Sequence, residues 1–288
     1  MANSNLAREF PAAHADREFV FTEADFEFIR RLVSEKTGIV LSDAKRNLVY
    51  SRLSRRLRQL RLAHFGDYCD LLKAGDAGEL VNFVNAITTN LTSFFRENHH
   101  FEYLRDTLLP ELMKTKTERR LRGWSAGCSS GEEPYSLAMV LCESLPEKGW
   151  DARILATDLD SEVVAKAQRG IYTQERVDGI ANERLRRWFL RGKGDNHGLV
   201  QARQALRERL HFRQLNLMHD WPISGPLDFI FCRNVVIYFD KPTQRVLFDR
   251  FADLLPVGGH LFVGHSESLF KVTDRFKLIG KTIYRKVY

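Results

Sequence analysis

From Leu121 onward, short apolar runs alternate with helical patterns. The helical patterns lie near 133–145, 161–169 and 243–255, and the apolar runs between them are LRGWSAG, ARILATD, LDFIFCRN and GHLFVGH. Strand–helix alternation of this kind predicts a parallel sheet with helices on both faces. The last two segments, GHLFVGH and FKLIGKTIYRKVY, leave no room for a crossover helix between them. We therefore expect antiparallel strands at the end of the sheet.

The N-terminal part of the chain has a different pattern, with apolar residues at helical spacing. Residues 1–18 are small, polar and aperiodic, and we expect a flexible tail there. Thr22 and Asp25 then form a candidate capping box, and Gly38 is a predicted helix stop. The expected domains are a helical domain at 19–90, a linker helix at 91–120 and an α/β domain at 121–288.

Residues 170–213 interrupt the strand–helix alternation. This segment contains ten basic residues against five acidic ones, and it includes the turn-like stretch GKGDNHG. It is too long for an ordinary connection between two elements. We predict a small subdomain inserted into the α/β domain.

The composition is that of a globular protein. Of the 288 residues, 44% are apolar and 28% are charged, which excludes a wholly disordered chain. No apolar run reaches the roughly 18 residues that span a bilayer, and the N-terminus lacks a signal-peptide pattern. The four cysteines form no C-x-x-C pair. We therefore expect reduced thiols in a cytoplasmic protein that is not inserted in a membrane.

A glycine-containing loop follows the first predicted strand, in the segment SAGCSSGEE. Gly127 and Gly131 would let the backbone approach a ligand at the carboxyl end of the sheet. The dinucleotide fingerprint and the phosphate loop are both absent. Two carboxylates open the next helix instead, which disfavours a pyrophosphate and favours a cationic ligand. A tight turn with two acids at a helix N-terminus would explain the same residues.

Asp158 ends the second predicted strand, 27 residues after Gly131. A carboxylate at this place can accept hydrogen bonds from both hydroxyls of a ribose. The alternative role, capping the next helix, suits Asp160 or Ser161 better. With the glycine loop, Asp158 indicates a ligand that has a ribose, a positive charge and no phosphate. S-adenosylmethionine has all three properties, and NAD does not.

Five segments together resemble one known family: TTNLTSFFRENHHF, SAGCSSGEEPYSLAM, ATDLD, FCRNVVIYFD and GHSES. They are similar to segments of the chemotaxis receptor methyltransferases (CheR), S-adenosylmethionine-dependent enzymes that esterify glutamate side chains on bacterial chemoreceptors. The resemblance covers nearly the whole chain from about residue 20. It implies an α/β fold with a Rossmann-like seven-stranded methyltransferase sheet, an N-terminal all-helical domain and a small inserted β-subdomain. It also implies a monomer.

The resemblance further implies which residues bind S-adenosylmethionine and its product S-adenosylhomocysteine. Arg96 would hold the carboxylate of the cofactor or line the methyl-transfer pocket, and Asp158 would bind the ribose. Asn216 and Leu217 would flank the adenine. Arg96 and Tyr238 are the expected catalytic residues, with Tyr238 facing the reactive methyl group. The expected cofactor contacts are Asn90, Thr92, Arg96, Glu133, Asp158, Asn216, Leu217, Arg233 and Asn234.

Methyl transfer to a carboxylate requires little from the protein beyond alignment. A glutamate with a pKa of about 4.3 is already ionised at neutral pH, so no general base is needed. We therefore expect Arg96 and Tyr238 to orient the reactants. We expect no metal: the adjacent His99 and His100 would point about 100° apart on a helix, and no carboxylate–histidine spacing completes a site.

A basic segment runs from Lys45 to Arg61, with seven basic residues and no acidic one. On a helical wheel Lys45, Arg52, Arg55 and Arg56 gather on one face, which indicates a negatively charged partner rather than a merely solvated face. Nucleic acid and the acidic methylation region of a receptor would both fit. The scarcity of aromatic residues disfavours single-stranded nucleic acid. The resemblance favours the cytoplasmic domain of a methyl-accepting chemoreceptor.

Three further possibilities concern partners and activity. The loop GKGDNHG resembles the full-length form found in relatives that bind the receptor's C-terminal pentapeptide, so tethering through the inserted subdomain is a hypothesis. A methyltransferase of the same fold that acts on nucleic acid is one alternative. Its Asn/Asp-Pro-Pro-aromatic loop is replaced here by RNVVIYF. A non-catalytic adaptor that binds the cofactor as a signal is the other.

Overall fold

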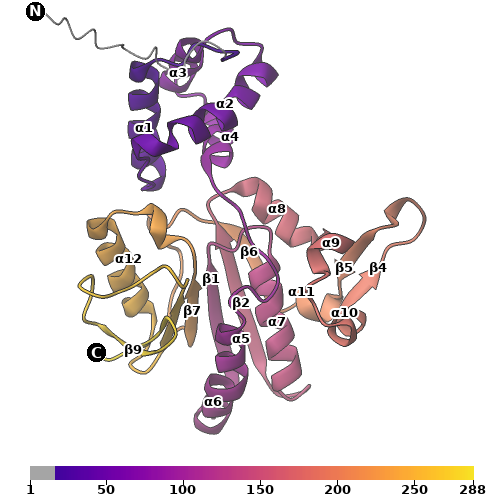
Figure 1. Ribbon diagram of the computed structural model, residues 1–288. Helices are drawn as coiled ribbons and strands as arrows, with labels where there is room; N and C mark the ends of the chain where they lie inside the picture. Colours follow the sequence, from indigo (N-terminus) through magenta and orange to yellow (C-terminus); the bar gives the residue numbers. More distant parts are fainter. Residues whose placement is uncertain (1–16) are drawn as a thin grey trace, which may run out of the picture.

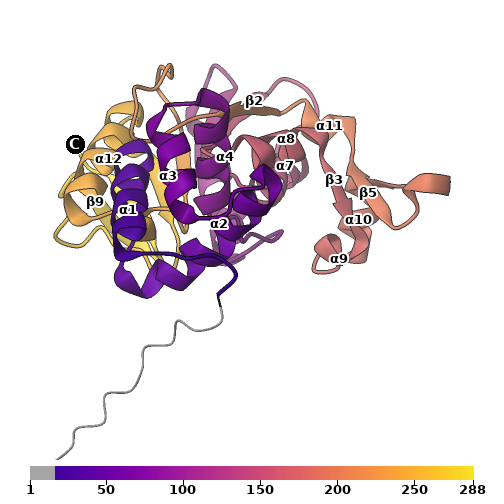
Figure 2. The same cartoon turned by 90° about the horizontal axis from the view of Figure 1, so that it is seen from above.

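The computed structural model describes residues 17–288, so nearly all of the tail expected at 1–18 lies outside the described residues. Figure 1 shows a helical domain placed over one end of a larger α/β domain, with a small subdomain projecting to one side. Figure 2, seen from above, shows that the helical domain covers the α/β domain but not this subdomain.

The helical domain contains five helical elements: α1 (Glu23–Thr37), η1 (Asp43–Lys45), α2 (Arg46–Leu60), α3 (Phe65–Lys73) and α4 (Ala77–Ile87). The predicted capping box starts α1, because the backbone N–H of Asp25 donates to the Thr22 hydroxyl and the Asp25 carboxylate accepts from the Thr22 N–H. Gly38 ends this helix at a φ of 74°. A compact core that includes Phe26, Leu53 and Phe83 joins the helices.

The α/β domain is built on a seven-stranded sheet of order β6-β2-β1-β7-β8-β10-β9. Strands β6, β2, β1, β7 and β8 are parallel, and β10 is antiparallel to both of its neighbours. The predicted fold class and the antiparallel end of the sheet are therefore confirmed. The strands are β1 (Arg120–Ala126), β2 (Asp151–Asp158), β6 (Leu210–Gln214), β7 (Phe229–Cys232), β8 (His260–Val263), β9 (Phe276–Gly280) and β10 (Ile283–Lys286).

Helices cover both faces of this sheet. In β7, Phe229 and Phe231 join the core on one face, and Ile230 and Cys232 join the core on the other, as alternation along a strand requires. The second face is covered by α12 (Lys241–Leu254). The first face is covered by α5 (His99–Tyr103), the π-helical turn η2 (Leu104–Leu108), α6 (Leu109–Thr115), α7 (Glu132–Ser144) and α8 (Ser161–Arg169).

The segment expected as a linker helix at 91–120 is helical only from His99 to Thr115. Its side chains Phe101, Leu104 and Leu108 belong to the core of the α/β domain. The true connection between the domains is the stretch 88–98, which we call the linker; it contains no helix longer than a turn. The apolar pattern of the helix is explained by this packing against the sheet.

The inserted subdomain has a three-stranded antiparallel sheet of order β3-β5-β4. The last part of the segment predicted as inserted, from Leu210, forms the edge strand β6 of the main sheet and pairs with β2. The insertion therefore ends earlier than 213. Its elements are β3 (Ile171–Thr173), α9 (Gln174–Val177), α10 (Asn182–Trp188), β4 (Phe189–Arg191), η3 (Gly194–Asn196), β5 (Leu199–Ala202) and α11 (Gln204–Arg207).

The helices of residues 17–288 are short. The longest, α1 and α2, have 15 residues each. Within this described part of the chain, no helix has the length and apolar character needed to cross a membrane.

Candidate active site between the two domains

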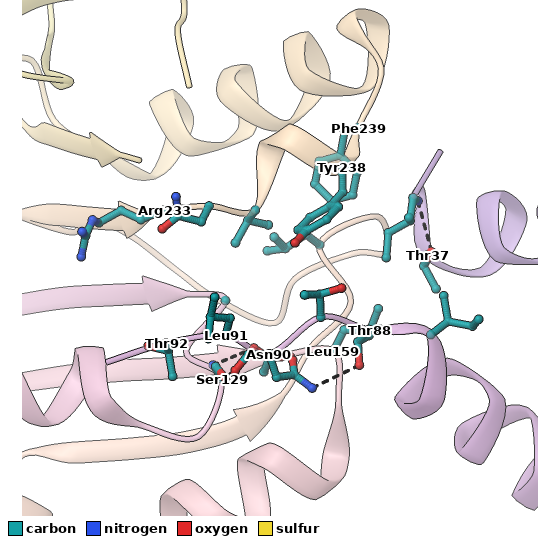
Figure 3. Close-up of a pocket in the computed structure, with 18 of the residues that line it drawn as sticks. Thr37, Thr88, Asn90, Leu91, Thr92, Ser129, Leu159, Arg233, Tyr238 and Phe239 are labelled. Carbon is teal, nitrogen blue, oxygen red and sulfur yellow. Dashed lines mark hydrogen bonds between the residues drawn. The ribbon is translucent and has the colours of Figure 1, made fainter. Parts of the chain in front are cut away.

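A cavity of about 320 Å³ lies between the helical domain and the carboxyl ends of β1, β2 and β7 (Figure 3). The sheet contributes the loops that follow these strands, the helical domain contributes part of α2, and the linker passes along the cavity. All of the residues expected to bind the cofactor lie on its wall, together with Tyr238 at the end of η4 (Val236–Tyr238). These residues are Asn90, Thr92, Arg96, Glu133, Asp158, Asn216, Leu217, Arg233, Asn234 and Tyr238.

The glycine loop turns tightly at the end of β1. Gly127 and Gly131 both have a φ of 100°, a conformation that favours glycine. A Cβ atom at Gly127 would also collide with the side chain of Val235. The N–H groups of Gly127 and Cys128 both donate to the carbonyl of Thr157, at 2.8 Å each. The loop is therefore held against the end of β2, where Asp158 lies.

Asp158 is buried, with 9% of its surface exposed, and its carboxylate accepts from the backbone N–H of Ser129 at 2.8 Å and of Asp160 at 3.0 Å. Burial raises the pKa of Asp158 to about 6, and these backbone hydrogen bonds oppose the increase. No lysine, arginine or histidine of residues 17–288 forms an ion pair with it. Its remaining lone pairs can therefore accept hydrogen bonds from hydroxyl groups of a ligand in the cavity.

Asp160 ties the linker to the sheet. One of its oxygens caps α8, accepting from the N–H groups of Glu162 and Val163, as the sequence predicted. The other accepts from the Thr88 hydroxyl at 2.9 Å and from the Asn90 amide at 2.7 Å. This second role was missed, because its partners lie about 70 residues away and no local pattern marks them. The linker is thereby fixed where it enters the cavity.

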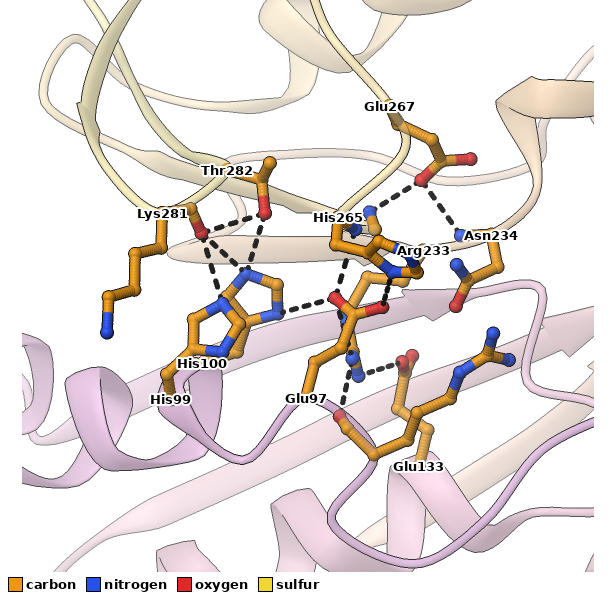
Figure 4. A network of polar contacts seen from close by, with 12 residues as sticks. Glu97, His99, His100, Glu133, Arg233, Asn234, His265, Glu267, Lys281 and Thr282 are labelled. Atoms are coloured by element: carbon orange, nitrogen blue, oxygen red, sulfur yellow. Dashed lines mark hydrogen bonds and ion pairs between the residues drawn. The ribbon is translucent and has the colours of Figure 1, made fainter.

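Arg233, directly after β7, is at the centre of a buried polar network (Figure 4). Its side chain is 2% exposed and lies 3.0 Å from a carboxylate oxygen of Glu133 and 3.3 Å from one of Glu97. It also donates to the carbonyl oxygen of Arg96. Burial raises the pKa of Glu133, and the charge of Arg233 and a hydrogen bond from Ser125 oppose it. The network thus connects the sheet to the linker residue Arg96.

Glu97 was not predicted from the sequence. Its carboxylate accepts from Nδ1 of His265 at 2.9 Å and from the His265 N–H at 3.1 Å. Burial alone would raise the pKa of Glu97, but the hydrogen bonds of His265 and the charge of Arg233 lower it to about 2. Glu97 has a φ of 55°, unusual for a residue with a side chain. The ion pair with Arg233 and the hydrogen bonds with His265 hold the linker in this conformation.

The structure also brings Glu97 close to His99 and His100, whose candidate ligand atoms all lie within 4.8 Å of one another. The sequence spacing alone did not indicate this grouping. However, Nε2 of His99 and Nε2 of His100 lie 3.2 and 3.0 Å from the carbonyl of Lys281. Burial lowers the pKa of His100 to about 3, so it is neutral. Because Glu97 is shared with Arg233 and His265, we assign the three side chains to the polar network.

Arg96 and Tyr238 approach the cavity from different elements. Arg96 donates to the carbonyl of Leu91 at 2.9 Å, which keeps its guanidinium over the linker. Tyr238 points into the cavity from the wall opposite Asn90 (Figure 3). Its carbonyl accepts from the N–H of Val40 at 2.9 Å, a contact with the helical domain. The position of Tyr238 therefore depends on both domains.

The four basic residues expected to bind a partner have different surroundings. Lys45 and Arg52 line the cavity, and Arg55 is exposed outside it. Arg52 donates to the carbonyl of Ile87 and to the hydroxyl of Thr89. Arg56 instead pairs with the buried Glu79, which also accepts from the hydroxyl of Tyr68. Arg56 is thus held by a contact inside the helical domain, and its expected role in receptor binding stays a prediction.

The inserted subdomain also contacts the site, which the sequence did not predict. Arg176 donates to the carbonyl of Thr92 at 3.3 Å and lies 3.4 Å from the carboxylate of Glu132, whose side chain is 1% exposed. The hydroxyl of Tyr172 donates to the carbonyl of Ser130 at 2.9 Å, and its ring packs 5.0 Å from that of Phe94. The subdomain therefore supports both the glycine loop and the linker.

The fold and the site together define a class. The sheet has seven strands in this order, and a glycine loop follows β1. A buried acid ends β2 on the wall of a cavity at the carboxyl ends of the strands. These features together are those of an S-adenosylmethionine-dependent methyltransferase. The donor set fits the cofactor, since Asp158 offers free lone pairs for ribose hydroxyls and the cavity holds no phosphate-binding motif.

Comparison with known proteins identifies the family. Residues 90–285 match the CheR methyltransferase SAM-binding domain, and residues 24–88 match the CheR methyltransferase all-alpha domain. The chain therefore belongs to the CheR methyltransferases, as its resemblance predicted. It is an S-adenosylmethionine-dependent methyltransferase of chemotaxis.

The chain is similar to chemotaxis methyltransferases of bacteria over most of its length. It is 46% identical to chemotaxis protein methyltransferase 2 of Pseudomonas aeruginosa, covering 93% of this chain and 95% of that one. It is 44% identical to the chemotaxis protein methyltransferase of Escherichia coli, covering 91% of each. Among solved structures, a geranyl diphosphate C-methyltransferase from Streptomyces coelicolor has a TM-score of 0.34 at 16% identity, covering 58% of this chain and 44% of that chain.

Proposed function

We propose that this chain transfers a methyl group from S-adenosylmethionine to glutamate side chains in the cytoplasmic domain of a chemoreceptor, forming methyl esters. The observation that carries the proposal is the composition of the cavity wall. Acidic Asp158 and Glu133 lie on the sheet side, where a cationic cofactor would bind, and Lys45 and Arg52 lie on the helical side. An anionic acceptor would be attracted to that second side.

Particular residues would hold the cofactor when it is bound. Asp158 would accept hydrogen bonds from the ribose hydroxyls, and Asn216 and Leu217 would contact the adenine. Glu133 and Arg233 carry opposite charges that suit the amino and carboxylate groups of the methionine part. When bound, the cofactor supplies a methyl group attached to a positively charged sulfur.

The protein's part in the reaction is to align and to exclude water. The acceptor carboxylate is already ionised, so one of its oxygens forms the new bond to the methyl carbon as the carbon–sulfur bond breaks. The bonding pair stays on sulfur, and no proton is exchanged. Opposite charges disappear in this step, so a poorly hydrated site favours it. Arg96 and Tyr238 would orient the acceptor oxygen toward the methyl group.

The direct test is to locate the methyl group by mass spectrometry. A receptor cytoplasmic fragment, incubated with the enzyme and S-adenosylmethionine, should gain one methyl group on glutamate-containing peptides. Methylation of lysine, arginine or added nucleic acid, with no methylated glutamate, would contradict the proposal. Cofactor binding with no methylated product on any of several receptor fragments would favour the adaptor function instead.

We also propose that the inserted subdomain binds the receptor's C-terminal pentapeptide. Strand β4 pairs with β5 on one side and, among the described residues, with no strand on its other side. Such an edge can accept an extended peptide as an additional strand. Binding there would raise the enzyme concentration near the methylation sites. Calorimetry with the pentapeptide should give a binding isotherm that truncation of the insertion abolishes, and a flat titration of the intact chain would exclude tethering.

A further inference from the structure

The carboxylate of Glu267 is buried behind the loop that follows β7. Glu267 belongs to the GHSES segment after β8 and is 3% exposed. Its oxygens accept from the backbone N–H groups of Asn234 and Val235 at 2.8 Å each and of Ile237 at 3.3 Å. They also accept from the N–H of Gly264. Figure 4 shows the bond to Asn234.

Backbone groups alone stabilise this charge. No lysine, arginine or histidine among the described residues forms an ion pair with Glu267. Burial raises the pKa of Glu267, and the four backbone hydrogen bonds oppose the increase. Burying a carboxylate without a cation is costly. The cost is offset only if the N–H groups of Asn234, Val235 and Ile237 stay directed at this side chain.

The loop bound by Glu267 carries residues of the cofactor site. Arg233 and Asn234 at its start and Tyr238 at its end line the cavity, whereas Glu267 does not. The loop is also strained, since Asn234 has a φ of 58°. Gly264 packs so closely on it that an added Cβ would lie 2.9 Å from the backbone nitrogen of Asn234. Such a conformation persists only where its surroundings fix it.

We propose that Glu267 is a positioning residue of the methyltransferase site. By binding the N–H groups of Asn234, Val235 and Ile237, it sets where the loop places Asn234 and Tyr238 relative to the cofactor and the acceptor. It acts through this loop and touches neither reactant. The part of the inference that concerns Tyr238 rests on the proposed function. The part that concerns cofactor binding rests only on the fold class.

The test is Glu267→Gln. Glutamine keeps the volume of the side chain, but its NH2 group would face two N–H donors whichever way the amide is turned. We expect weaker binding of S-adenosylhomocysteine by calorimetry and a kcat about 10- to 100-fold lower, because displacement of a site by about 1 Å costs this much. Gly264→Ala should displace Asn234 directly, because the added Cβ would collide with its backbone. We expect the same losses of S-adenosylhomocysteine affinity and of kcat. This variant keeps the test available if Glu267→Gln fails to fold.

The matched control is Asp228→Asn at the opposite end of β7. Asp228 is 4% exposed, accepts from the N–H of Arg122 at 2.8 Å and does not line the cavity. We expect it to lower Tm without changing the Kd for S-adenosylhomocysteine. If Glu267→Gln and Gly264→Ala lower Tm but leave Kd and kcat at wild-type values, the inference is overturned. The binding measurement needs no acceptor, so a failure of the proposed glutamate methylation would be seen separately.

Discussion

At the scale of single residues, Asp158 has the charge that should respond most to the cofactor. Its pKa is raised to about 6 by burial, and its ligand-facing lone pairs have no cationic partner among the described residues. Protonation would convert one acceptor oxygen into a donor. A ribose diol, which donates two hydrogen bonds, therefore binds best to the ionised form.

The pH dependence of cofactor binding follows from this. We predict that affinity for S-adenosylmethionine falls as pH decreases through about 6, by up to about tenfold per pH unit. Glu97 and His100 have pKa values of about 2 and about 3, so neither changes charge in this range. Calorimetry from about pH 5 to 7.5 measures the profile.

Asp158→Asn is the control for that profile. It should bind about 10- to 100-fold more weakly at neutral pH, the cost of one or two charge-assisted hydrogen bonds, and its profile should be flat. A profile that still falls below pH 6 in this variant would assign the titration to another group, with Glu133 the next to examine.

Arg96 and Tyr238 are predicted to act on the chemical step more than on cofactor binding. Arg96→Ala and Tyr238→Phe should lower kcat by about 100-fold or more, because alignment is their main contribution. Arg245→Ala, an exposed arginine on α12, should have no effect. Single-turnover rates measured with saturating cofactor separate the two effects. Near-normal turnover of Arg96→Ala would remove Arg96 from the mechanism.

A site residue could be predicted from the sequence only where the neighbouring residues mark its position. Asp158 and Glu133 follow a strand or open a helix, so their positions mark them in the sequence. Glu97 and Glu267 were missed. Arg233 lies 136 residues from Glu97, and the loop bound by Glu267 lies about 30 residues from it. The pairing of Arg56 with Glu79 was missed because its helical-wheel position does not reveal a partner 23 residues away.

At the scale of elements, the linker and the inserted subdomain depend on each other. The linker has no helix to fix it. Asp160 accepts from the side-chain amide of Asn90 at one end, and Arg176 donates to the backbone carbonyl of Thr92 near the middle. Arg176 is also the cation beside the buried carboxylate of Glu132. The inserted subdomain, which the sequence predicted without any contact to the site, therefore supports the cofactor loop.

Arg176→Ala should weaken cofactor binding and destabilise the fold at the same time. The loss of one hydrogen bond to Thr92 predicts a Kd about 2- to 10-fold higher. The unpaired Glu132 should also lower Tm. Calorimetry and thermal unfolding measure the two effects.

A second variant separates the two contacts of Arg176. Adding Glu132→Gln to Arg176→Ala removes the unpaired buried charge, so Tm should recover while Kd stays high. Recovery of both Tm and Kd would mean that only the contact of Arg176 with Glu132 matters. The hydrogen bond from Arg176 to Thr92 would then contribute nothing to cofactor binding.

The helix and strand boundaries show what pattern analysis can and cannot provide. The start of α1 and its end at Gly38 were predicted because a capping box and a glycine stop are local signals. The segment predicted as inserted, 170–213, includes most of β6 (Leu210–Gln214), because no glycine or proline separates that strand from the residues before it. The helix at 99–115 was expected to connect the domains, since periodicity alone does not say which surface it packs on.

At the scale of the whole molecule, the site exists only where the two domains meet. The Asn216 amide donates to the carbonyl of Lys36 at 2.7 Å, and the Val40 N–H donates to the carbonyl of Tyr238 at 2.9 Å. Gly38 allows close approach, because a Cβ there would lie 2.7 Å from the sulfur of Met218. These contacts place Lys45 and Arg52 on one side of the cavity. The carboxyl ends of the sheet strands form its other side.

The basic face of α2 should therefore govern recognition of the acceptor and not of the cofactor. Arg55 is exposed and does not line the cavity. Arg55→Glu should lower kcat/KM for the receptor about 3- to 10-fold at low ionic strength, and the deficit should shrink as salt is added. Arg245→Glu makes the same change in net charge on α12 and should have little effect. Equal losses in both variants would indicate a response to net charge and not to this face.

The most direct test of the account is the chemical nature of the product. The enzyme is incubated with receptor-containing membranes and S-adenosylmethionine radiolabelled in its methyl group, and the labelled protein is then treated with mild alkali. A carboxyl methyl ester hydrolyses under these conditions, so we predict that the label is released as methanol. Label that resists alkali would place the methyl group on nitrogen or carbon and would contradict the proposed glutamate esterification.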